Sequence, residues 1–365
     1  MLFRVFHHSV PRRVFVAGVE ALEGRKLFSS CPAGSVASNT VHAGPSHPTL
    51  APRRALQSAD ARSFQVVAAT DSTRSDGAKL VYRPGGADSA QNPAVSPDGK
   101  ILLFTVFHDG YNNGAAGLYE LPVAGGRVTR VLDDGDHDNV NLPGPAWNAL
   151  TGRIAFASDV NRKDEIWTMA SHGGALVQVT RHRGTSHFIE PSFSPDGKWI
   201  VFEVDPNVPD GQIRGSIWKI RADGTGLTQL TAGKAFDDRQ PNWSPKGNLI
   251  LIQRRVPRSD RWQLYTMKPD GSGLRLVTGN KGTNTDASWS PDGARIVFSS
   301  DEGTLPSANL YVIAAAGGTP VRVTRDATHE DGAASWSPDG KSIYFESHLS
   351  ADESSPASIR RIASP

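Results

Sequence analysis

The sequence predicts an all-β fold, a six-bladed β-propeller whose blades are four-stranded antiparallel sheets. A phrase in which Ser-Pro-Asp-Gly precedes an apolar run recurs along the chain, as in "FSPDGKWIVF" (193–202) and "WSPDGARIVF" (289–298). Units anchored on this phrase or on a rewritten form of it follow one another at intervals of 46–52 residues. The 365 residues include 36 Gly and 25 Pro, and so many turn formers favour many short strands.

The register of the repeat is kept even where its turn is rewritten, as in "NALTG" (148–152) and "SPKG" (244–247). The residues just before the six turns are Val95, Trp147, Phe193, Trp243, Trp289 and Trp336. A large apolar residue follows each turn at a constant distance, namely Phe104, Phe156, Phe202, Ile252, Phe298 and Phe345. The chain therefore contains six units.

Each unit contains four segments that read as strands. In the fifth unit they are residues 287–289, 295–300, 309–314 and 321–324. One four-stranded sheet cannot bury both of its faces, and radial stacking around an axis solves this problem while leaving only short edges. The Trp and Phe series is therefore expected to form the core between blades.

The turn chemistry explains the recurring phrase. Pro presets φ for the second turn position, Asp can accept a hydrogen bond from the backbone ahead of it, and Gly tolerates positive φ. Further Gly-rich turns, such as "DGTG" (223–226) and "DGSG" (270–273), connect third to fourth strands. Strands flank these turns and no helix follows them, so they are not phosphate-binding loops.

The two ends of the chain are predicted to close the ring. The sixth unit ends in a segment (358–365) that matches a third strand, with no fourth strand after it. Residues 75–85 match residues 269–280 in turn and strand, so Lys79–Arg83 is expected to be the outer strand of the last blade. The strand-like residues 64–70 either add an edge strand or pack nearby.

Residues 1–75 are predicted to be a largely disordered basic extension, and residues 76–365 the propeller. The extension has nine Lys or Arg against four Asp or Glu, and it lacks sustained periodicity. Its apolar stretch (14–24) resembles part of a targeting peptide but is interrupted by Glu20 and Glu23, and "LFSSC" (27–31) faintly resembles a lipid-attachment site. A solvated extension or a misassigned start is the alternative.

Composition excludes several function classes. The propeller part is slightly acidic, which argues against nucleic-acid binding. Cys31 is the single cysteine, so neither an intrachain disulfide nor a cysteine zinc site can form. No apolar run reaches the length of about 18 residues needed to span a membrane.

The repeat resembles that of TolB-type propellers. The phrase "WSPDGARIVF", the following "LYVI" (310–313) and "DGSG" with its strand carry the resemblance, which covers about 290 of the 365 residues. It implies a six-bladed propeller, an extracytoplasmic or periplasmic location and binding of a partner protein. The same repeat type occurs in propeller domains of serine peptidases and in some pectin-fragment lyases. Residues 1–75 are too short and too rich in Pro and Ser for the α/β domain of TolB, and no G-x-S-x-G motif occurs.

Two rims are expected. The turns joining first to second and third to fourth strands mark one, the clamped rim. The blade-to-blade connections and the loops joining second to third strands mark the other, the irregular rim, where loops on a rigid scaffold converge on the channel mouth.

We call the residue just before each turn the anchor of its unit. The residues three positions before the six anchors should ring the channel: Asn92, Gly144, Glu190, Gln240, Asp286 and Ala333. Carboxylate and amide oxygens suit hard cations, so Asn92, Glu190, Gln240 and Asp286 are a candidate site for Ca²⁺ or a similar ion. The favoured interpretation is that they bind channel water and neighbouring backbone, with no cofactor.

Three histidines lie in irregular-rim loops near acids: His137, His187 and His329. Imidazole and carboxylate together could form an acid–base or transition-metal site. Solvated loop histidines are the alternative.

The leading hypothesis is a monomeric, non-catalytic scaffold that binds a protein or peptide at the irregular rim. Acids of that rim are expected to steer a basic partner: Asp136, Asp138, Glu190, Asp237, Asp238, Asp286, Glu330 and Asp331. The rival hypothesis is a channel-site enzyme, a carbohydrate lyase or a lactone hydrolase, that uses a bound cation or a His/acid pair.

Overall fold

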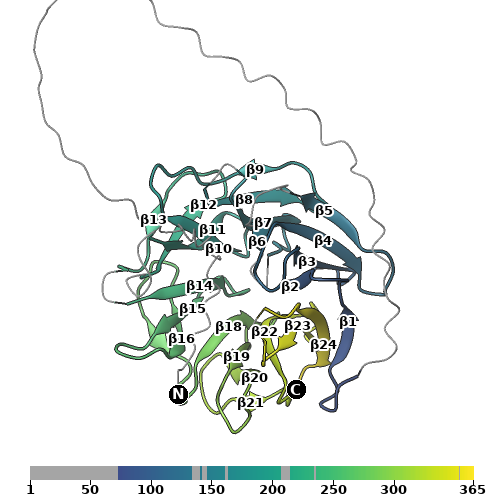
Figure 1. Ribbon diagram of the computed structural model, residues 1–365. Coiled ribbons are helices and arrows are strands. Elements are labelled where there is room, and N and C mark those ends of the chain that lie inside the picture. The colour runs from purple at the N-terminus through teal and green to yellow at the C-terminus, as the bar shows by residue number, and fades with distance from the viewer. Residues whose placement is uncertain are drawn as a thin grey trace, which may run out of the picture. The chain divides into compact units, whose positions relative to one another are not determined.

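The computed structural model describes residues 73–133, 140–141, 146–160, 163–206, 214–233, 236–352 and 354–365. Within these ranges the chain forms strands β1 to β24 and no helix. The strands form six antiparallel four-stranded sheets that surround a central channel (Figure 1). The predicted six-bladed propeller is confirmed.

The first three blades follow one another along the chain, each with its first strand innermost (Figure 1). Blade 1 consists of β2 (Ser89–Val95), β3 (Ile101–Phe107), β4 (Ala116–Pro122) and β5 (Thr129–Asp133). Blade 2 consists of β6 (Val140–Asn141), β7 (Arg153–Ser158), β8 (Glu165–Ala170) and β9 (Val177–Gln178). Blade 3 consists of β10 (His187–Phe193), β11 (Trp199–Asp205), β12 (Ser216–Arg221) and β13 (Thr228–Gln229).

The last three blades repeat this order, except that an early strand completes the sixth. Blade 4 consists of β14 (Asp238–Trp243), β15 (Ile250–Arg255), β16 (Trp262–Met267) and β17 (Arg275–Leu276). Blade 5 consists of β18 (Asn284–Trp289), β19 (Arg295–Ser300), β20 (Asn309–Ala314) and β21 (Val321–Arg322). Blade 6 consists of β22 (His329–Trp336), β23 (Ser342–Leu349), β24 (Ser358–Ala363) and β1 (Lys79–Tyr82).

The predicted register agrees with the strands. Five of the six anchor residues end a first strand, and the sixth, Trp147, forms a bridge to Ile154 at the equivalent place. The six large apolar residues predicted to follow the turns are each at most 1% exposed: Phe104, Phe156, Phe202, Ile252, Phe298 and Phe345. They belong to hydrophobic clusters that combine residues of two neighbouring blades, as where Phe298 of blade 5 packs with Leu251 and Leu264 of blade 4. The predicted inter-blade core is therefore confirmed.

The Ser-Pro-Asp-Gly turns are held by one repeated network. In the turn of blade 5, Ser290 Oγ donates to Asp292 Oδ1 at 2.5 Å and accepts from the Arg295 N–H at 2.9 Å. Asp292 Oδ1 also accepts from the Ala294 N–H at 3.0 Å. Gly293 has φ +62°, a conformation that glycine adopts without steric cost. This network fixes the hairpin between the first two strands and so the clamped rim.

The ring closes as predicted. Strand β1 pairs antiparallel with β24, with Lys79 opposite Arg361 and Tyr82 opposite Ile359. Just before β1, Arg74 binds Asp331 of blade 6 through two hydrogen bonds of 2.8 and 2.7 Å. Arg74, which the sequence assigned to the extension, is thus anchored to the propeller. Residues 1–72 of the predicted extension, including 64–70, lie outside the described residues.

Candidate functional site

The innermost strands carry a bulge at the positions predicted to ring the channel. The pairing of first and second strands shifts register there in five blades. The residue at each shift has positive φ: Asn92 (53°), Glu190 (52°), Gln240 (46°), Asp286 (52°) and Ala333 (44°). Three of them precede a proline, a residue that lacks an N–H and is tolerated at bulges of edge strands. The bulge departs from the ordinary strand alternation and re-aims these side chains.

The five bulge residues line one cavity in the channel. Its empty space, counted together with the solvent at its mouth, is about 360 Å³. The lining is completed by Pro241, Asn242, Ala287, Ser288 and Ala334. Gly144, the sixth predicted ring position, lies outside the described residues. The structure therefore brings together every ring position that it describes.

Side chains of neighbouring residues hold the backbone of the bulges. The Asn92 N–H donates to Glu346 Oε2 at 2.9 Å, and the Gln240 N–H donates to Glu203 Oε2 at 2.9 Å. The Asp286 N–H donates to Gln240 Oε1 at 3.1 Å. Because these bonds fix the backbone, the channel wall is built before any ligand arrives.

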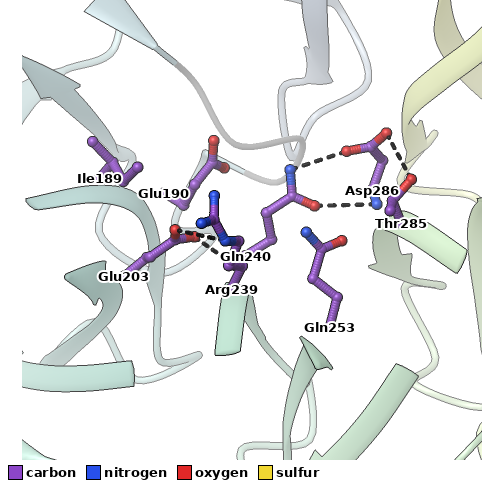
Figure 2. A pocket seen from close by; sticks show the side chains of 8 residues that line it. All are labelled: Ile189, Glu190, Glu203, Arg239, Gln240, Gln253, Thr285 and Asp286. Carbon is purple, nitrogen blue, oxygen red and sulfur yellow. Dashed lines mark hydrogen bonds and ion pairs between the residues drawn. The ribbon is translucent and has the colours of Figure 1, made fainter. Parts of the chain in front are cut away.

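A second cavity lies in the channel wall between blades 3, 4 and 5, and its empty space, counted together with the solvent at its mouth, is about 360 Å³ (Figure 2). Ring residues Glu190, Gln240 and Asp286 also line it. The other lining residues are Ile189, Glu203, Arg239, Gln253 and Thr285. We refer to it as the wall cavity.

Sequence reasoning missed Glu203 and Gln253 as site residues. Each follows the buried apolar residue of its second strand, Phe202 or Ile252, by one position. At this position every blade except the second carries a polar residue: Thr105, Glu203, Gln253, Ser299 and Glu346. The sequence signal that could have identified them is a polar residue directly after the buried apolar residue of a second strand.

Arg239 is the positive centre of the wall cavity. Its Nε lies 3.0 Å from Asp237 Oδ1 and 3.9 Å from Glu203 Oε1, and its Nη1 lies 3.5 Å from Asp205 Oδ2. Burial alone lowers the pKa of Arg239, but the three carboxylates outweigh burial and raise it above its ordinary value. Arg239 is therefore a permanent cation at this site.

Glu203 is buried beside this cation and beside a second acid. Burial raises the pKa of Glu203 well above its ordinary value, and the nearby Asp205 carboxylate adds to the rise. The charge of Arg239 opposes it. Glu203 can therefore take up or release a proton far from the pH range of an exposed glutamate.

Three of the acids predicted to steer a partner are buried in ion pairs. Asp237 contacts Arg239, and Asp238 accepts from Arg254 Nε at 2.5 Å and Nη2 at 2.8 Å. Asp331 is 1% exposed and bound by Arg74. These carboxylates face arginines inside the fold and not solvent, because each lies on or next to an inner strand that packs against a neighbouring blade.

The remaining predicted acids are placed differently. Glu190 and Asp286 line both cavities, and Glu330 Oε2 lies 3.8 Å from His348 Nε2. Asp136 and Asp138 lie outside the described residues.

The predicted histidines are not brought together where the structure describes them. His187 pairs with Asp164 in the region of blades 2 and 3, whereas His329 Nδ1 lies 3.2 Å from Asp326 Oδ1 at blade 6. Blades 3 and 6 are on opposite sides of a six-bladed ring. His137 lies outside the described residues.

The exposed charges of the irregular rim are mainly positive in its described part. The exposed cations there are Arg83, Lys163, Arg181, Arg183, Arg214, Arg258, Arg261, Lys281 and Arg325. The exposed carboxylates there are Asp109, Asp260, Asp301 and Asp352. Three of the acids expected on this rim, Asp237, Asp238 and Asp331, are used in internal ion pairs instead.

The fit of a metal ion to the ring is poor. Gln240 Nε2 donates to Asp286 Oδ1 and Gln240 Oε1 accepts from the Asp286 N–H, so neither end of this amide is directed to a central ion. Across the described residues, no three His, Cys, Asp or Glu side chains are grouped so that they could hold a metal. A Ca²⁺ site at the ring stays a prediction.

We compared the chain with known proteins and solved structures. No protein-family model matches the chain. An uncharacterised protein of Agrobacterium fabrum is 26% identical over 215 residues, which cover 56% of this chain and 67% of that protein. A TolB homologue of Chlorobium luteolum is 31% identical over 156 residues, which cover 41% of this chain and 33% of the homologue. The structure of a putative TolB from Agrobacterium tumefaciens superimposes with a TM-score of 0.55 at 23% identity, covering 79% of this chain and 93% of that one.

The domain is a TolB-like β-propeller. The same fold is seen in an oligogalacturonate lyase in complex with manganese, with a TM-score of 0.54, 14% identity and coverage of 81% of this chain and 95% of that one. The match to the Chlorobium homologue spans only about a third, 33%, of that protein's length. In the described part of the chain, no helix has the length and apolar character needed to cross a membrane.

Proposed function

We propose that the TolB-like propeller is a non-catalytic binding module that holds a segment of a partner protein at the mouth of its channel. The observation that supports this proposal is the arrangement of charge in two zones. Carboxylates and amides from the inner strands line the channel cavities, whereas exposed Arg and Lys side chains predominate on the described rim around them. A ligand that satisfies both zones must carry charges of both signs, as a protein segment does.

Preorganisation supports the same proposal. The bulged backbone that shapes the channel is already held by Glu203, Gln240 and Glu346. A binding surface that does not reorganise loses less conformational entropy on association, so more of the contact energy appears as affinity. A uniformly negative polymer would suit the rim but would be repelled by the carboxylates of the channel.

The proposal can be tested by selecting ligands from a random peptide library displayed on phage, with the full-length protein as target. Selected peptides would be synthesised, and their affinities measured by fluorescence anisotropy. Reversal of channel charge in Glu190→Lys is expected to weaken binding by at least about tenfold, the cost of losing an interface hot spot. Reversal of rim charge in Arg181→Glu should slow association, and the effect should decline as salt is added.

Matched reversals on the clamped rim serve as controls. Asp98 and Asp196 are exposed turn residues of the clamped rim, so Asp98→Lys and Asp196→Lys should leave peptide affinity unchanged. Selected peptides that bind all four variants equally, or a library that yields no specific peptide, would count against a channel-mouth binding module.

A channel-site enzyme is the alternative function, as a carbohydrate lyase or a lactone hydrolase. Two observations favour it: the fold is shared with an oligogalacturonate lyase, and Glu203 is a buried acid of raised pKa beside Arg239 in a cavity, a combination frequent at catalytic sites. Incubation with oligogalacturonides, with and without Mn²⁺, and with simple lactones tests it. Turnover seen as ultraviolet absorbance of an unsaturated product or as acid release, and abolished by Glu203→Gln, would replace the binding proposal.

A further inference from the structure

The wall cavity contains a buried amide oxygen that no described group satisfies. Gln253 is 7% exposed, and its Oε1 is fully buried without a hydrogen-bond partner. In Figure 2 the Gln253 amide points into the wall cavity, below the pair formed by Gln240 and Asp286, and no interaction joins it to either. A buried polar group without a partner costs about 1–3 kcal/mol, so a ligand that satisfies it gains correspondingly.

Glu203 brings a second buried acceptor to the same cavity. Its Oε2 accepts the Gln240 N–H, whereas its Oε1 accepts from no N–H or hydroxyl donor. Glu203 also forms a hydrogen bond with the Asp205 carboxyl, and this bond requires a proton on one of the two acids. The nearest cation, Arg239 Nε, lies 3.9 Å from Oε1, which is beyond hydrogen-bond distance. Gln253 Oε1 therefore lacks a donor, and Glu203 Oε1 lacks one when Glu203 and Asp205 are both ionised.

The charge of the cavity indicates what would supply those donors. Glu190, Glu203 and Asp286 line it, and Arg239 is the one cation among its lining residues as described. This guanidinium also serves Asp205 and Asp237, so negative charge is in excess. The guanidinium repels any further cation, but it repels a singly charged organic cation less than a divalent metal ion, and the organic cation can direct its N–H groups to the acceptors.

We propose that the wall cavity binds a basic side chain, with its N–H donors bonded to Glu203 Oε1 and the Gln253 amide. This deepens the proposed function, since it names the kind of partner residue that would enter the channel. Lysine and arginine share the required chemistry, a positive charge that carries N–H donors.

Proton linkage gives the proposal a second observable. Glu203 faces Asp205 along the same strand and is flanked by Arg239, Asp237, Glu190 and Asp286, and its pKa is raised by burial. A bound cation favours the ionised carboxylate, so binding should release a proton from Glu203. Affinity for a basic ligand should therefore rise with pH until Glu203 is ionised in the free protein.

The test uses small probes and the full-length protein, so that no partner is needed. Binding of Nα-acetyl-lysine methylamide and Nα-acetyl-arginine methylamide would be followed by saturation-transfer difference NMR, with the uncharged Nα-acetyl-norleucine methylamide as the matched control. At least one basic probe should bind, and the norleucine probe should not. Glu203→Gln and Gln253→Leu should each weaken the basic probe by about tenfold or more.

Two further variants separate the local effect from general ones. Gln229→Leu on the exposed strand β13 repeats the Gln253→Leu change away from the channel, and Asp98→Asn removes one carboxylate from the clamped rim. Both should bind the basic probes as the unchanged protein does. Thermal melts of all variants would show that they are folded.

Three results would overturn the inference: equal binding of the norleucine probe, undiminished binding in folded Gln253→Leu, or stoichiometric displacement of the probes by Ca²⁺. The test is independent of the peptide selection above. Probe binding without any selected peptide would leave the wall cavity as a cation site and reject the partner-binding function. Selected peptides without probe binding would support the partner-binding function and reject the cation site in the wall cavity.

Discussion

Gln240 and Asp286 bridge blades 4 and 5 by two hydrogen bonds, from Gln240 Nε2 to Asp286 Oδ1 at 3.0 Å and from the Asp286 N–H to Gln240 Oε1 at 3.1 Å (Figure 2). Both residues have positive φ at equivalent bulges of their inner strands. The amide of one bulge therefore holds the backbone of the next, and the pair separates the wall cavity from the centre of the channel, since both residues line both.

Replacing this amide should destabilise the seam between the two blades. Gln240→Leu removes both bonds and leaves the Asp286 N–H without its acceptor, which should cost about 1–3 kcal/mol of unfolding free energy. Denaturant unfolding measures this, and Gln229→Leu on exposed strand β13 is the control. A loss no greater than that of the control would show that the bridge contributes little.

Ring closure should depend on the strand that completes blade 6. A chain that begins at Gly85 lacks β1 and Arg74, so β24 loses its partner strand and Asp331 is left as a buried charge without its cation. Its melting temperature should fall well below that of a chain that begins at Thr73. Deletion of residues 1–62 alone should leave the melting temperature almost unchanged. Equal melting of the Gly85 and Thr73 chains would contradict the closure.

The second strands should be far more sensitive than the clamped turns. Phe298 is 0% exposed, so Phe298→Ala should cost about 3–5 kcal/mol through lost burial and a cavity. Asp292 is a turn residue whose exposed carboxylate binds Ser290 and one backbone N–H, so Asp292→Ala should cost much less. Urea unfolding measures the loss of unfolding free energy in each variant. A similar loss in both would contradict the assignment of Phe298 to the buried core.

Acid should weaken the Arg74 anchor through Asp76. Burial alone raises the pKa of Asp76, but the hydrogen bond from Arg74 and two from backbone N–H groups outweigh it, so the pKa lies below its ordinary value. Such a carboxylate stabilises the fold above its unfolded pKa of about 4, and the contribution is lost as pH falls toward the folded pKa. Asp76→Asn should therefore melt below the unchanged protein at neutral pH.

The difference between Asp76→Asn and the unchanged protein should shrink as the pH of the thermal melt is lowered into the acid range, because the native carboxylate then becomes protonated too. A difference that stayed constant over the whole pH range would show that the charge of Asp76 is not what stabilises the anchor.

Calcium should not stabilise the channel. Of the predicted ring, only Glu190 and Asp286 bring charge, and Gln240 Oε1 already accepts the Asp286 N–H. Added CaCl₂ or a chelator should leave the melting temperature unchanged, and elemental analysis should find no stoichiometric metal. A saturable rise in melting temperature with Ca²⁺ that disappears in Glu190→Gln would establish the ion site.

Most of the fold could be predicted from the sequence repeat, because each of its signals is local. A turn such as Ser290–Gly293 and an apolar strand such as Ile296–Phe298 are specified by neighbouring residues. Because these elements recur in every unit, each sheet has apolar faces that must be covered by neighbouring sheets, and a closed ring of blades achieves this. The bulge positions could be counted from the anchors for the same reason, and the match of residues 75–85 to a fourth strand located the closing strand.

Only the tertiary structure determined which acids of the irregular rim are buried in ion pairs. Asp237, Asp238 and Asp331 read in the sequence as loop acids, but folding sets each beside an arginine, so their charge is satisfied internally. Glu203 and Gln253 read as ordinary strand residues, yet packing places both at one cavity, where one side-chain oxygen of each accepts from no N–H or hydroxyl donor. Sequence periodicity determines which way a side chain leaves its own strand; which residue of another blade it then meets depends on how the ring closes.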